Sequence, residues 1–418
     1  MSSKIALLQA NPIVGDIKGN SKQIVEMAKL ASDNGANFAV TTELAISGYP
    51  PRDLLLQTDF VQECHETASS LNTEIPVLVG TPVPPSSPRS LPGNGVVRAG
   101  DSVREVTRKQ LLPTYDVFDE ARYFEADERP GIARTIAGLD VGVTICEDAW
   151  QHCGATPNDY DSDPIEQIVE WGRQGVILHA TVNLSASPYH SDKSGTRIAV
   201  ARSAAASLDH PFLLANQVGG NDDLLFDGRS IIAWPDGRAV IAPAWTQGVL
   251  LTDLSNPEEC VWFGEGEVTI LQPGDELEET EDDLLDAIII GLSDYCRKSG
   301  ISKIVLGLSG GIDSALAACI ASSAVGPKNV TGISMPSRHS SQHSIDDAKA
   351  TANALGINFE MQPISDLHDS ADSTLSSVLS NGHPVAGENL QARLRGLIVM
   401  AHANANGAMA IATGNKSE

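Results

Sequence analysis

Short apolar runs alternate with amphipathic stretches over residues 1–264. Residues 21–32, for example, place Ile24, Met27 and Leu30 at helical spacing. This alternation predicts an α/β core built in layers, with residues 81–95, rich in Pro and Ser, as an exposed loop. The segments that we expect to form strands are Ile5–Gln9, Phe38–Thr42, Val77–Gly80, Val141–Ile145, Val176–Ala180, Phe212–Asn216 and Ser230–Trp234.

A second α/β pattern begins at Leu284. Its order of helices and strands predicts a doubly wound parallel sheet. The expected elements are a helix from Leu284, the strand Ile304–Leu308, a helix over 314–324, the strand Val330–Met335 and a helix over 344–355. Residues 265–283 between the two patterns are acidic and poor in apolar side chains, so we expect a linker there. The predicted organisation is therefore 1–264, the linker 265–283, and 284–418.

The length of 418 residues supports two domains, because one hydrophobic core stops growing at roughly 250–300 residues. The net charge of −26 would repel phosphate groups, so we expect no nucleic acid partner. The six cysteines include no C-x-x-C pair, which argues against a disulfide framework or a zinc site. There is no apolar stretch of about 18 residues, so we expect no membrane partner and a cytoplasmic location.

Two side chains with complementary chemistry follow predicted strands, and a third, Lys109, precedes the segment Gln110-Leu-Leu-Pro. Cys146 comes directly after the run Val141–Ile145, and Glu43 follows Phe38–Thr42. A thiol needs a base to become a nucleophile, and a carboxylate can take its proton and later return it to a leaving amine. Lys109 supplies a cation that could stabilise an oxyanion. Taken singly, each residue is as easily explained by a buried thiol or a charged surface side chain.

The sequence around these residues makes the chemical interpretation stronger. Residues 42–50 (TELAISGYP), 108–115 (RKQLLPTY) and 145–148 (ICED) resemble, in order, the catalytic segments of the nitrilase, or carbon–nitrogen hydrolase, superfamily. The resemblance implies an αββα sandwich. It also implies that Glu43 is the general base, Lys109 the oxyanion stabiliser and Cys146 the nucleophile of an amidase.

Two further segments resemble the glutamine-using members of that superfamily. In residues 115–124 (YDVFDEARYF), the resemblance implies that Tyr115 contacts glutamine and that Glu120 is a second acid that orients Lys109. In residues 183–193, it implies that Ser187 and Lys193 bind the amino-acid head group. The alternative for the second segment is a plain turn.

A glycine-rich loop follows the predicted strand Ile304–Leu308 and opens a helix. Backbone N–H groups in such a loop can approach phosphate oxygens, and the helix N-terminus favours their negative charge. The loop lacks the Gly-Lys-Ser/Thr ending of a Walker motif and instead resembles the S-G-G-x-D-S loop of the ATP pyrophosphatases. The residues assigned to ATP on this basis are Gly307, Leu308, Ser309, Gly310, Gly311, Ile312, Asp313 and Ser314. Asp313 is also expected to hold Mg²⁺.

Later segments resemble NAD synthetases. Residues 388–395 (ENLQARLR) match the segment that contacts deamido-NAD, which implies that role for Asn389 and Arg393. Residues 412–418 match the segment from threonine to glutamate, which implies that Thr413 binds ATP. There Glu418 would bind Mg²⁺ and lie at the deamido-NAD site. Without the resemblance, a solvated helix face would explain Arg393 and Arg395.

The two halves together resemble the glutamine-dependent NAD synthetase family over the whole chain. This implies ATP-dependent amidation of deamido-NAD with ammonia from glutamine, Mg²⁺ as cofactor, and homo-oligomers. Because family members continue beyond the last motif, we expect this chain to be a fragment that hydrolyses glutamine but makes little NAD. The alternatives are an amidase with a regulatory or inactive nucleotide-binding part, a synthetase for another acid, and a scaffold without activity.

Overall fold

The computed structural model describes residues 3–87, 89–128, 130–157, 159–191, 193–264, 266–274, 281–338, 340–380 and 385–413. The chain divides into two compact units, Met1–Asp283 and Leu284–Glu418. Each unit has its own sheets and its own hydrophobic core.

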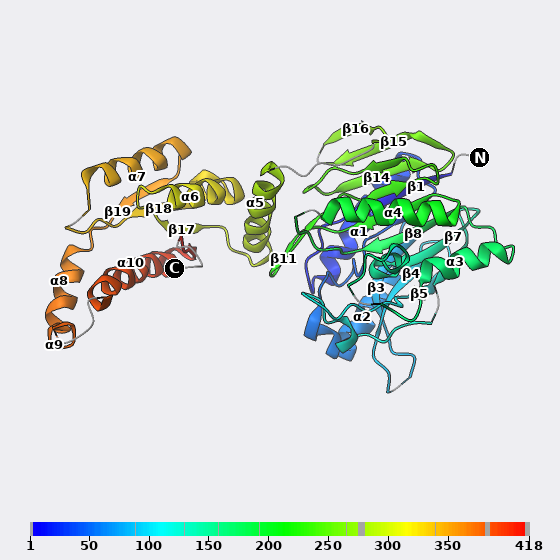
Figure 1. The fold of residues 1–418 in the computed structure, drawn as a ribbon, viewed down its shortest axis with the longest axis horizontal. Helices are drawn as coiled ribbons and strands as arrows, with labels where there is room; N and C mark the ends of the chain where they lie inside the picture. Colours follow the sequence, from blue (N-terminus) through cyan, green and yellow to red (C-terminus); the bar gives the residue numbers. More distant parts are fainter. Residues whose placement is uncertain are drawn as a thin grey trace. The chain divides into compact units, whose positions relative to one another are not determined.

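Two sheets form the centre of the first unit (Figure 1). The larger has the strand order β16-β15-β14-β1-β2-β3-β4-β5, with β1 (Lys4–Gln9), β2 (Phe38–Val40), β3 (Val77–Val83), β4 (Gly93–Ala99), β5 (Arg104–Arg108), β14 (Gly248–Asp253), β15 (Asn256–Gly264) and β16 (Glu267–Leu271). The smaller has the order β13-β12-β9-β8-β7-β6, with β6 (Gly131–Ile136), β7 (Leu139–Ile145), β8 (Ala180–Ser185), β9 (Phe212–Asn216), β12 (Ile231–Ala233) and β13 (Ala239–Ile241). A separate hairpin pairs β10 (Val218–Asn221) with β11 (Leu224–Asp227).

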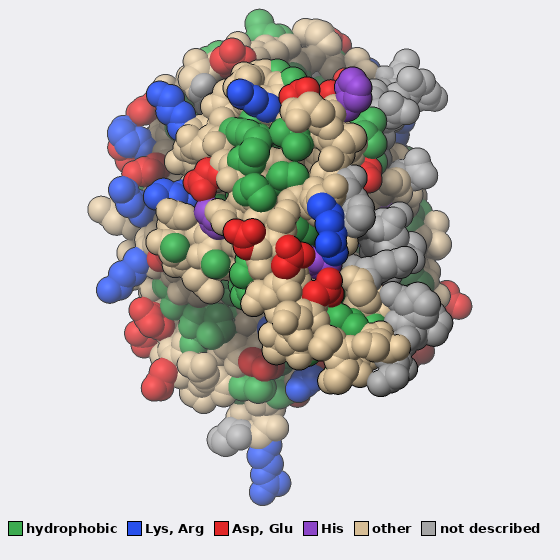
Figure 2. All heavy atoms as spheres, turned by 90° about the vertical axis from the view of Figure 1, so that its left-hand side faces the viewer, with side chains coloured by type: hydrophobic (Ala, Val, Ile, Leu, Met, Phe, Trp, Pro, Cys, Tyr) green, Lys and Arg blue, Asp and Glu red, His purple; other side chains and the backbone are tan. Residues whose placement is uncertain are grey.

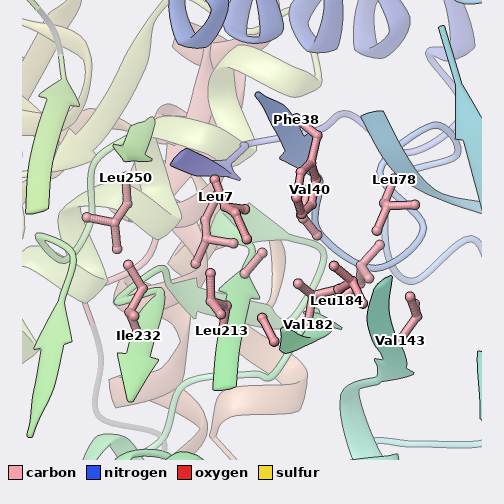
Figure 3. Packing of buried hydrophobic residues seen from close by; sticks show 14 of the residues in the cluster. Leu7, Phe38, Val40, Leu78, Val143, Val182, Leu184, Leu213, Ile232 and Leu250 are labelled. Atoms are coloured by element: carbon pink, nitrogen blue, oxygen red, sulfur yellow. The ribbon is translucent and has the colours of Figure 1, made fainter. Parts of the chain in front are cut away.

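Alternate residues of the central strands build separate cores on the two faces of each sheet. Leu7 and Val40 of the larger sheet meet Val143 and Val182 of the smaller sheet between the two layers (Figure 3). The outer face of the larger sheet packs against α1 (Ile17–Asp33) and α2 (Thr58–Ser69), and that of the smaller against α3 (Pro164–Arg173) and α4 (Lys193–Leu208). The order of layers is α-β-β-α, which confirms the predicted sandwich.

Local sequence signals explain where α1 and α3 begin. The Asp16 side chain accepts a hydrogen bond from the N–H of Gly19, and Asp163 accepts one from Glu166, so each helix has an acidic N-cap. Pro164 occupies the first turn of α3, where its missing N–H costs nothing. Short 3₁₀ helices are η1 (Arg52–Leu56), η2 (Glu120–Arg122), η3 (Cys146–Ala149) and η4 (Gln151–Cys153).

The second unit holds a parallel sheet of four described strands in the order β19-β18-β17-β20. The strands are β17 (Ile304–Gly307), β18 (Val330–Ser334), β19 (Asn358–Met361) and β20 (Met409–Ile411), and the helices are α5 (Glu281–Lys298), α6 (Ile312–Val325), η5 (Pro327–Asn329), α7 (Gln342–Leu355), α8 (Ser365–Thr374), α9 (Ser376–Leu379) and α10 (Val385–Asn406). Ile304 packs with the α6 and α7 side, whereas Val305 packs with Ile398 of α10. Helices therefore cover both faces, and the predicted doubly wound sheet is confirmed.

Two local predictions about strand positions were wrong. Only Ala180 of the predicted strand 176–180 is in β8, and Ile177 is 76% exposed. Residues 81–95 are not one loop, because β3 continues to Val83 and β4 begins at Gly93. In these two cases short-range composition was a poor guide, since pairing across the sheet decides where a strand begins and ends.

The predicted linker 265–283 was also wrong in part. β16 occupies Glu267–Leu271 and pairs with β15 at the edge of the larger sheet. Four of its five residues are exposed, as expected of a strand at the edge of a sheet. At the other end, Asp283 lies in the first turn of α5 and accepts a hydrogen bond from Arg229. Residues 275–280 lie outside the described part of the chain.

The surface mixes charge and apolar side chains in spite of the net charge of −26. On the face shown in Figure 2, acidic side chains are interspersed with basic and hydrophobic ones. Large exposed apolar side chains of the second unit include Leu316, Val378 and Leu397. Among the described residues, no helix combines the length and the hydrophobicity needed to cross a bilayer.

Candidate functional sites

The first candidate site lies where three strands of the first unit end. Glu43 follows β2, Lys109 follows β5 and Cys146 follows β7, so the αββα core brings together residues that are far apart in the chain. Lys109 Nζ lies 2.8 Å from Glu43 Oε1 and 2.8 Å from Glu120 Oε2. Glu43 and Lys109 are each only 1% exposed. The predicted second acid, Glu120, thus contacts Lys109 directly.

Two carboxylates keep the buried Lys109 charged. Burial opposes the ammonium form, but Glu120 and Glu43 outweigh it and hold the pKa of Lys109 well above its ordinary value. Burial in turn raises the pKa of Glu120 to about 7, with Lys109 acting in the opposite direction. Tyr49 also donates a hydrogen bond to Glu120 Oε1, at 2.8 Å. The result is a fixed cation beside two acids.

Glu43 is held from both of its oxygens. Oε1 accepts hydrogen bonds from Lys109 Nζ and from Asn94 Nδ2, the latter at 2.7 Å, while Oε2 accepts one from the backbone N–H of Ala186 at 3.0 Å. Such contacts fix the orientation of the carboxylate before any substrate arrives.

Cys146 begins η3 with a φ of +42°, in the left-handed region that non-glycine residues rarely occupy. Burial and the charge of Glu43 raise the pKa of the Cys146 thiol well above its ordinary range, although Lys109 acts in the opposite direction. The thiol is therefore protonated at neutral pH and needs a base when it attacks. Glu43, whose charge acts on this thiol, is suited to that role.

The four residues expected on the glutamine side fall into two groups. Glu120 is buried with Lys109, as described above. Tyr115 donates a hydrogen bond from its hydroxyl to Glu147 at 2.8 Å. Lys193 begins α4 and places Nζ 5.2 Å from the Trp150 ring centre, close enough to Cys146 for the ammonium to interact with the thiolate when it forms. Ser187 is buried after β8.

Glu147, next to the thiol, was not singled out from the sequence. It accepts hydrogen bonds from Tyr115 and, at 3.2 Å, from Tyr160. Burial raises its pKa, and these two hydroxyls together with the charges of Lys109 and Lys193 act in the opposite direction. A carboxylate and an ammonium group, Glu147 and Lys193, therefore lie near the nucleophile.

The second candidate site is the turn between β17 and α6. The Ser309 N–H donates to Ser314 Oγ at 3.2 Å, and the Gly311 N–H donates to Ser309 Oγ at 3.2 Å. Gly310 has a φ of +83°, and a Cβ there would lie 2.3 Å from the backbone oxygen of Ser344. Only glycine fits this turn, which lies at the carboxyl end of a central strand.

A cleft of about 840 Å³ opens beside this turn. Among the residues assigned to ATP, Gly307, Leu308, Ser309 and Thr413 line it. The others, Gly310, Gly311, Ile312, Asp313 and Ser314, continue from the turn into the first turn of α6. Asp313 is exposed there. The cleft lies where the strand order reverses between β17 and β20, the usual ligand position in a doubly wound sheet.

The residues assigned to deamido-NAD are less closely tied to this cleft. Asn389 and Arg393 are exposed one turn apart on α10 and are not among the lining residues, and Glu418 lies outside the described part of the chain. Arg395, by contrast, lines the cleft and donates from Nε to the backbone oxygen of Met335 at 3.3 Å. The solvated face considered for Arg395 was therefore wrong.

Comparisons with known proteins agree with this arrangement of two sites. Residues 4–258 match the family model "Carbon-nitrogen hydrolase", and residues 284–418 match "NAD synthase". The glutamine-dependent NAD(+) synthetase of Synechocystis is 40% identical, with 99% of this chain and 74% of the relative covered. The chain belongs to the glutamine-dependent NAD(+) synthetase family. The enzyme of that name from Thermotoga maritima is 35% identical over 99% of this chain and 74% of its own length.

A solved structure of the family supports the fold of both units. The glutamine-dependent NAD+ synthetase of Acinetobacter baumannii, in complex with ADP, has a TM-score of 0.85 and 30% sequence identity. The match covers 100% of this chain and 75% of that one. The predicted family membership is therefore confirmed.

Two buried residues of this family member hold the first site together and were missed from the sequence. Asn94 donates to Glu43, and its backbone oxygen accepts the N–H of Lys109 at 2.8 Å. Asp148 accepts the N–H groups of Gln110 and Leu111, at 3.0 and 2.9 Å, and that of Ile145 at 3.0 Å. Asp148 had a possible signal, because it stands two residues after Cys146. Asn94 had none, since only the β3–β4 pairing brings it to Glu43.

Proposed function

We propose that this protein makes NAD by ATP-dependent amidation of deamido-NAD, with ammonia released from glutamine in the first unit. The observation that carries this proposal is that one chain of the synthetase family holds both the buried Glu43–Lys109–Glu120 group beside Cys146 and the Ser309–Ser314 turn. The first can perform amide hydrolysis, and the second can bind a triphosphate.

In the glutaminase half, Glu43 takes the proton of Cys146 as the sulfur attacks the side-chain amide carbon of glutamine. The ammonium of Lys109 stabilises the resulting oxyanion. Glu43 then gives the proton to the departing ammonia, and water releases glutamate from the thioester. We propose that Glu147 faces the α-ammonium group, while Lys193 and Ser187 face the α-carboxylate. Tyr115 orients Glu147, because its hydroxyl already donates to that carboxylate.

In the synthetase half, the nicotinate carboxylate of deamido-NAD is adenylated by ATP, pyrophosphate leaves, and ammonia displaces AMP. Ser309, Ser314 and the N–H groups of the Gly310–Gly311 turn bind the phosphates, and Thr413 contributes from the end of β20. We place deamido-NAD near Asn389, Arg393 and Glu418.

Mg²⁺ is expected with the triphosphate, where it offsets the phosphate charge. The described residues contain no group of three metal-binding side chains. That fits a cation held by ATP oxygens with one or two carboxylates rather than by a protein cage. Asp313, exposed at the start of α6, fits such a role, and we propose Glu418 as the second carboxylate.

The partners are small molecules, and the acidic charge disfavours nucleic acid. On the resemblance to the family we also propose a homo-oligomer located in the cytoplasm.

The test is a comparison of nitrogen sources. In the full-length protein, Cys146→Ala should abolish NAD formation from glutamine and leave NAD formation from ammonium chloride within about threefold of the unaltered protein, because only the first half uses the thiol. If the unaltered protein hydrolyses glutamine but makes no NAD from either source, an amidase with a regulatory nucleotide site is the better explanation. If ammonium chloride does not support amidation of deamido-NAD but does support amidation of another carboxylic acid, deamido-NAD is not the acceptor.

A further inference from the structure

A fully buried carboxylate, Asp227 at the end of β11, lies outside the residues used above. Four side chains surround it, and they come from α4, β9 and the segment after β11. The contacts are Arg197 Nη1 at 2.9 and 3.1 Å, Ser194 Oγ at 3.1 Å, Arg229 Nη1 at 3.4 Å and Asn216 Nδ2 at 3.5 Å.

One branch from Asp227 leads to the first turn of α4. Lys193 begins this helix, and Ser194 and Arg197, which both donate to Asp227, lie in the same turn and the next. These bonds fix the helix start against β11. They thereby fix the backbone that carries the Lys193 ammonium, which lies over the Trp150 ring.

The other branch leads to the turn after β8. Asn216 directs Nδ2 to Asp227 and to the Gly228 oxygen, the latter at 2.8 Å. Its Oδ1 accepts the backbone N–H of Ser187 at 2.9 Å. The Gly228 oxygen and, at longer range, Asp227 hold the Nδ2 side of the Asn216 amide, and its Oδ1 side is thereby oriented to hold Ser187.

We propose that Asp227 is a positioning residue for the head-group half of the glutamine site, because it fixes Lys193 through α4 and Ser187 through Asn216. This inference rests on the proposed glutaminase function. Asp227 is fully buried and acts through its neighbours. It therefore sets the affinity for glutamine and leaves the thiol chemistry at Cys146 untouched.

The charges around Asp227 support this role. Arg197 is fully buried, and among the described residues its Nε and Nη2 find no hydrogen-bond acceptor, whereas its Nη1 pairs with Asp227, which offsets its charge. Burial and then the charge of Arg197 lower the pKa of Lys193, against the effect of Cys146. Neutralising Asp227 would leave Arg197 uncompensated near Lys193. It would also loosen the helix start that positions that ammonium.

The experiment uses Asp227→Asn in the full-length protein, with Asp253→Asn as the matched control. Asp253 is a buried carboxylate of the same unit, and it accepts hydrogen bonds from the backbone N–H and the hydroxyl of Ser255. Asp227→Asn should raise KM for glutamine on the order of tenfold or more and leave kcat within about threefold. The control should change neither. NAD formation from ammonium chloride should be the same in all three proteins.

A second measurement separates positioning from loss of fold. Iodoacetamide is small and lacks an amino-acid head group, so its rate of alkylation at Cys146, followed by mass spectrometry of that peptide, should be unchanged in Asp227→Asn. The glutamine concentration that protects Cys146 from alkylation should be about tenfold higher in Asp227→Asn, because it follows the weaker binding of glutamine. Should Asp227→Asn fail to fold, two other variants test the same idea. Asn216→Ala removes the branch to Ser187 and Ser194→Ala removes the branch to α4, and each should raise KM for glutamine without lowering kcat.

An unchanged KM, or a fall in kcat at unchanged KM, in these variants would overturn the proposal. Failure of the glutaminase function itself gives a different result, because then the unaltered protein would neither release glutamate nor show glutamine protection of Cys146.

Discussion

Asn94 is the residue through which the base and the cation of the first site are held in one geometry. Its side chain donates to Glu43, and its backbone accepts the N–H of Lys109. A hydrogen bond to a charged group contributes roughly 1.5–3 kcal/mol, which corresponds to about a 10- to 100-fold change in rate if the geometry is required for attack.

Asn94→Ala should therefore lower kcat for glutamine hydrolysis by about 10- to 100-fold. The measurement is glutamate release at saturating glutamine. NAD formation from ammonium chloride serves as the internal control and should not change. Asn256→Ala, at the half-buried start of β15 with a side-chain bond to Glu259, is a matched variant that should leave both rates intact. Equal losses with both nitrogen sources would contradict this view of Asn94.

At the scale of elements, the turn between β17 and α6 depends on a glycine. In Gly310→Ala, the new methyl group would lie 2.3 Å from the Ser344 oxygen, on a backbone with φ of +83°. Gly356 is also left-handed, with a φ of +69°, but none of the described atoms lies within 4 Å of the place where its Cβ would be. The two positions therefore separate a steric clash from the cost of a left-handed backbone.

Gly310→Ala should reduce NAD formation from ammonium by at least about 100-fold, because the turn must move to relieve the clash and its N–H groups then miss the phosphates. Gly356→Ala should cost only about 1 kcal/mol of stability and leave the rate nearly unchanged. Glutamine hydrolysis should be retained in both. A similar loss in both variants would mean that the clash is not what matters.

A histidine two residues before β9 makes the stability of the first unit sensitive to acid. His210 pairs with Thr181 of β8 at 2.8 Å, and burial lowers its pKa from 6.5 to about 4. In the folded state the ring is therefore neutral, whereas in the unfolded state it gains a proton below pH 6.5. The stability tied to the neutral ring is present above pH 6.5 and is lost as the pH falls to 4.

Between pH 6.5 and 4, the free energy of unfolding should fall by up to roughly 3 kcal/mol less in His210→Gln than in the unaltered protein. All five tryptophans, including Trp150 and Trp262, lie in the first unit, so their fluorescence during urea unfolding reports on that unit. His190→Gln, at an exposed position, is the control and should leave the slope unchanged. Equal slopes in all three proteins would rule out His210 as the acid-sensitive group.

At the scale of the whole molecule, the glutaminase machinery lies within Met1–Asp283, which has complete layers and its own core. A fragment of residues 1–283 should fold by itself and hydrolyse glutamine within about tenfold of the full-length rate, since a compact unit with its own core can fold alone. Glutamate release and a cooperative thermal transition are the measurements, with the Cys146→Ala fragment as the blank. A fragment that folds but is inactive would mean that the second unit is needed to complete the site.

The sequence by itself determined the alternation of strands and helices, the family and the order of the motifs. These depend on short-range patterns: apolar periodicity places most of the strands, and Glu43, Lys109 and Cys146 each stand in a recognisable segment. The same short-range reasoning failed at 176–180, at 81–95 and in the predicted linker, where hydrogen-bond pairing with a distant strand decides which backbone is extended.

Only the tertiary structure decided which residues support the motifs. Asn94 reaches Glu43 because β4 pairs with β3, and Asp227 reaches α4 and Asn216 because distant segments pack around it. Neither residue has a local sequence signal, since a buried polar side chain is recognised by its partners and those partners come from other parts of the chain. The sequence therefore determined the chemistry available to this protein, and packing decided the geometry in which that chemistry is held.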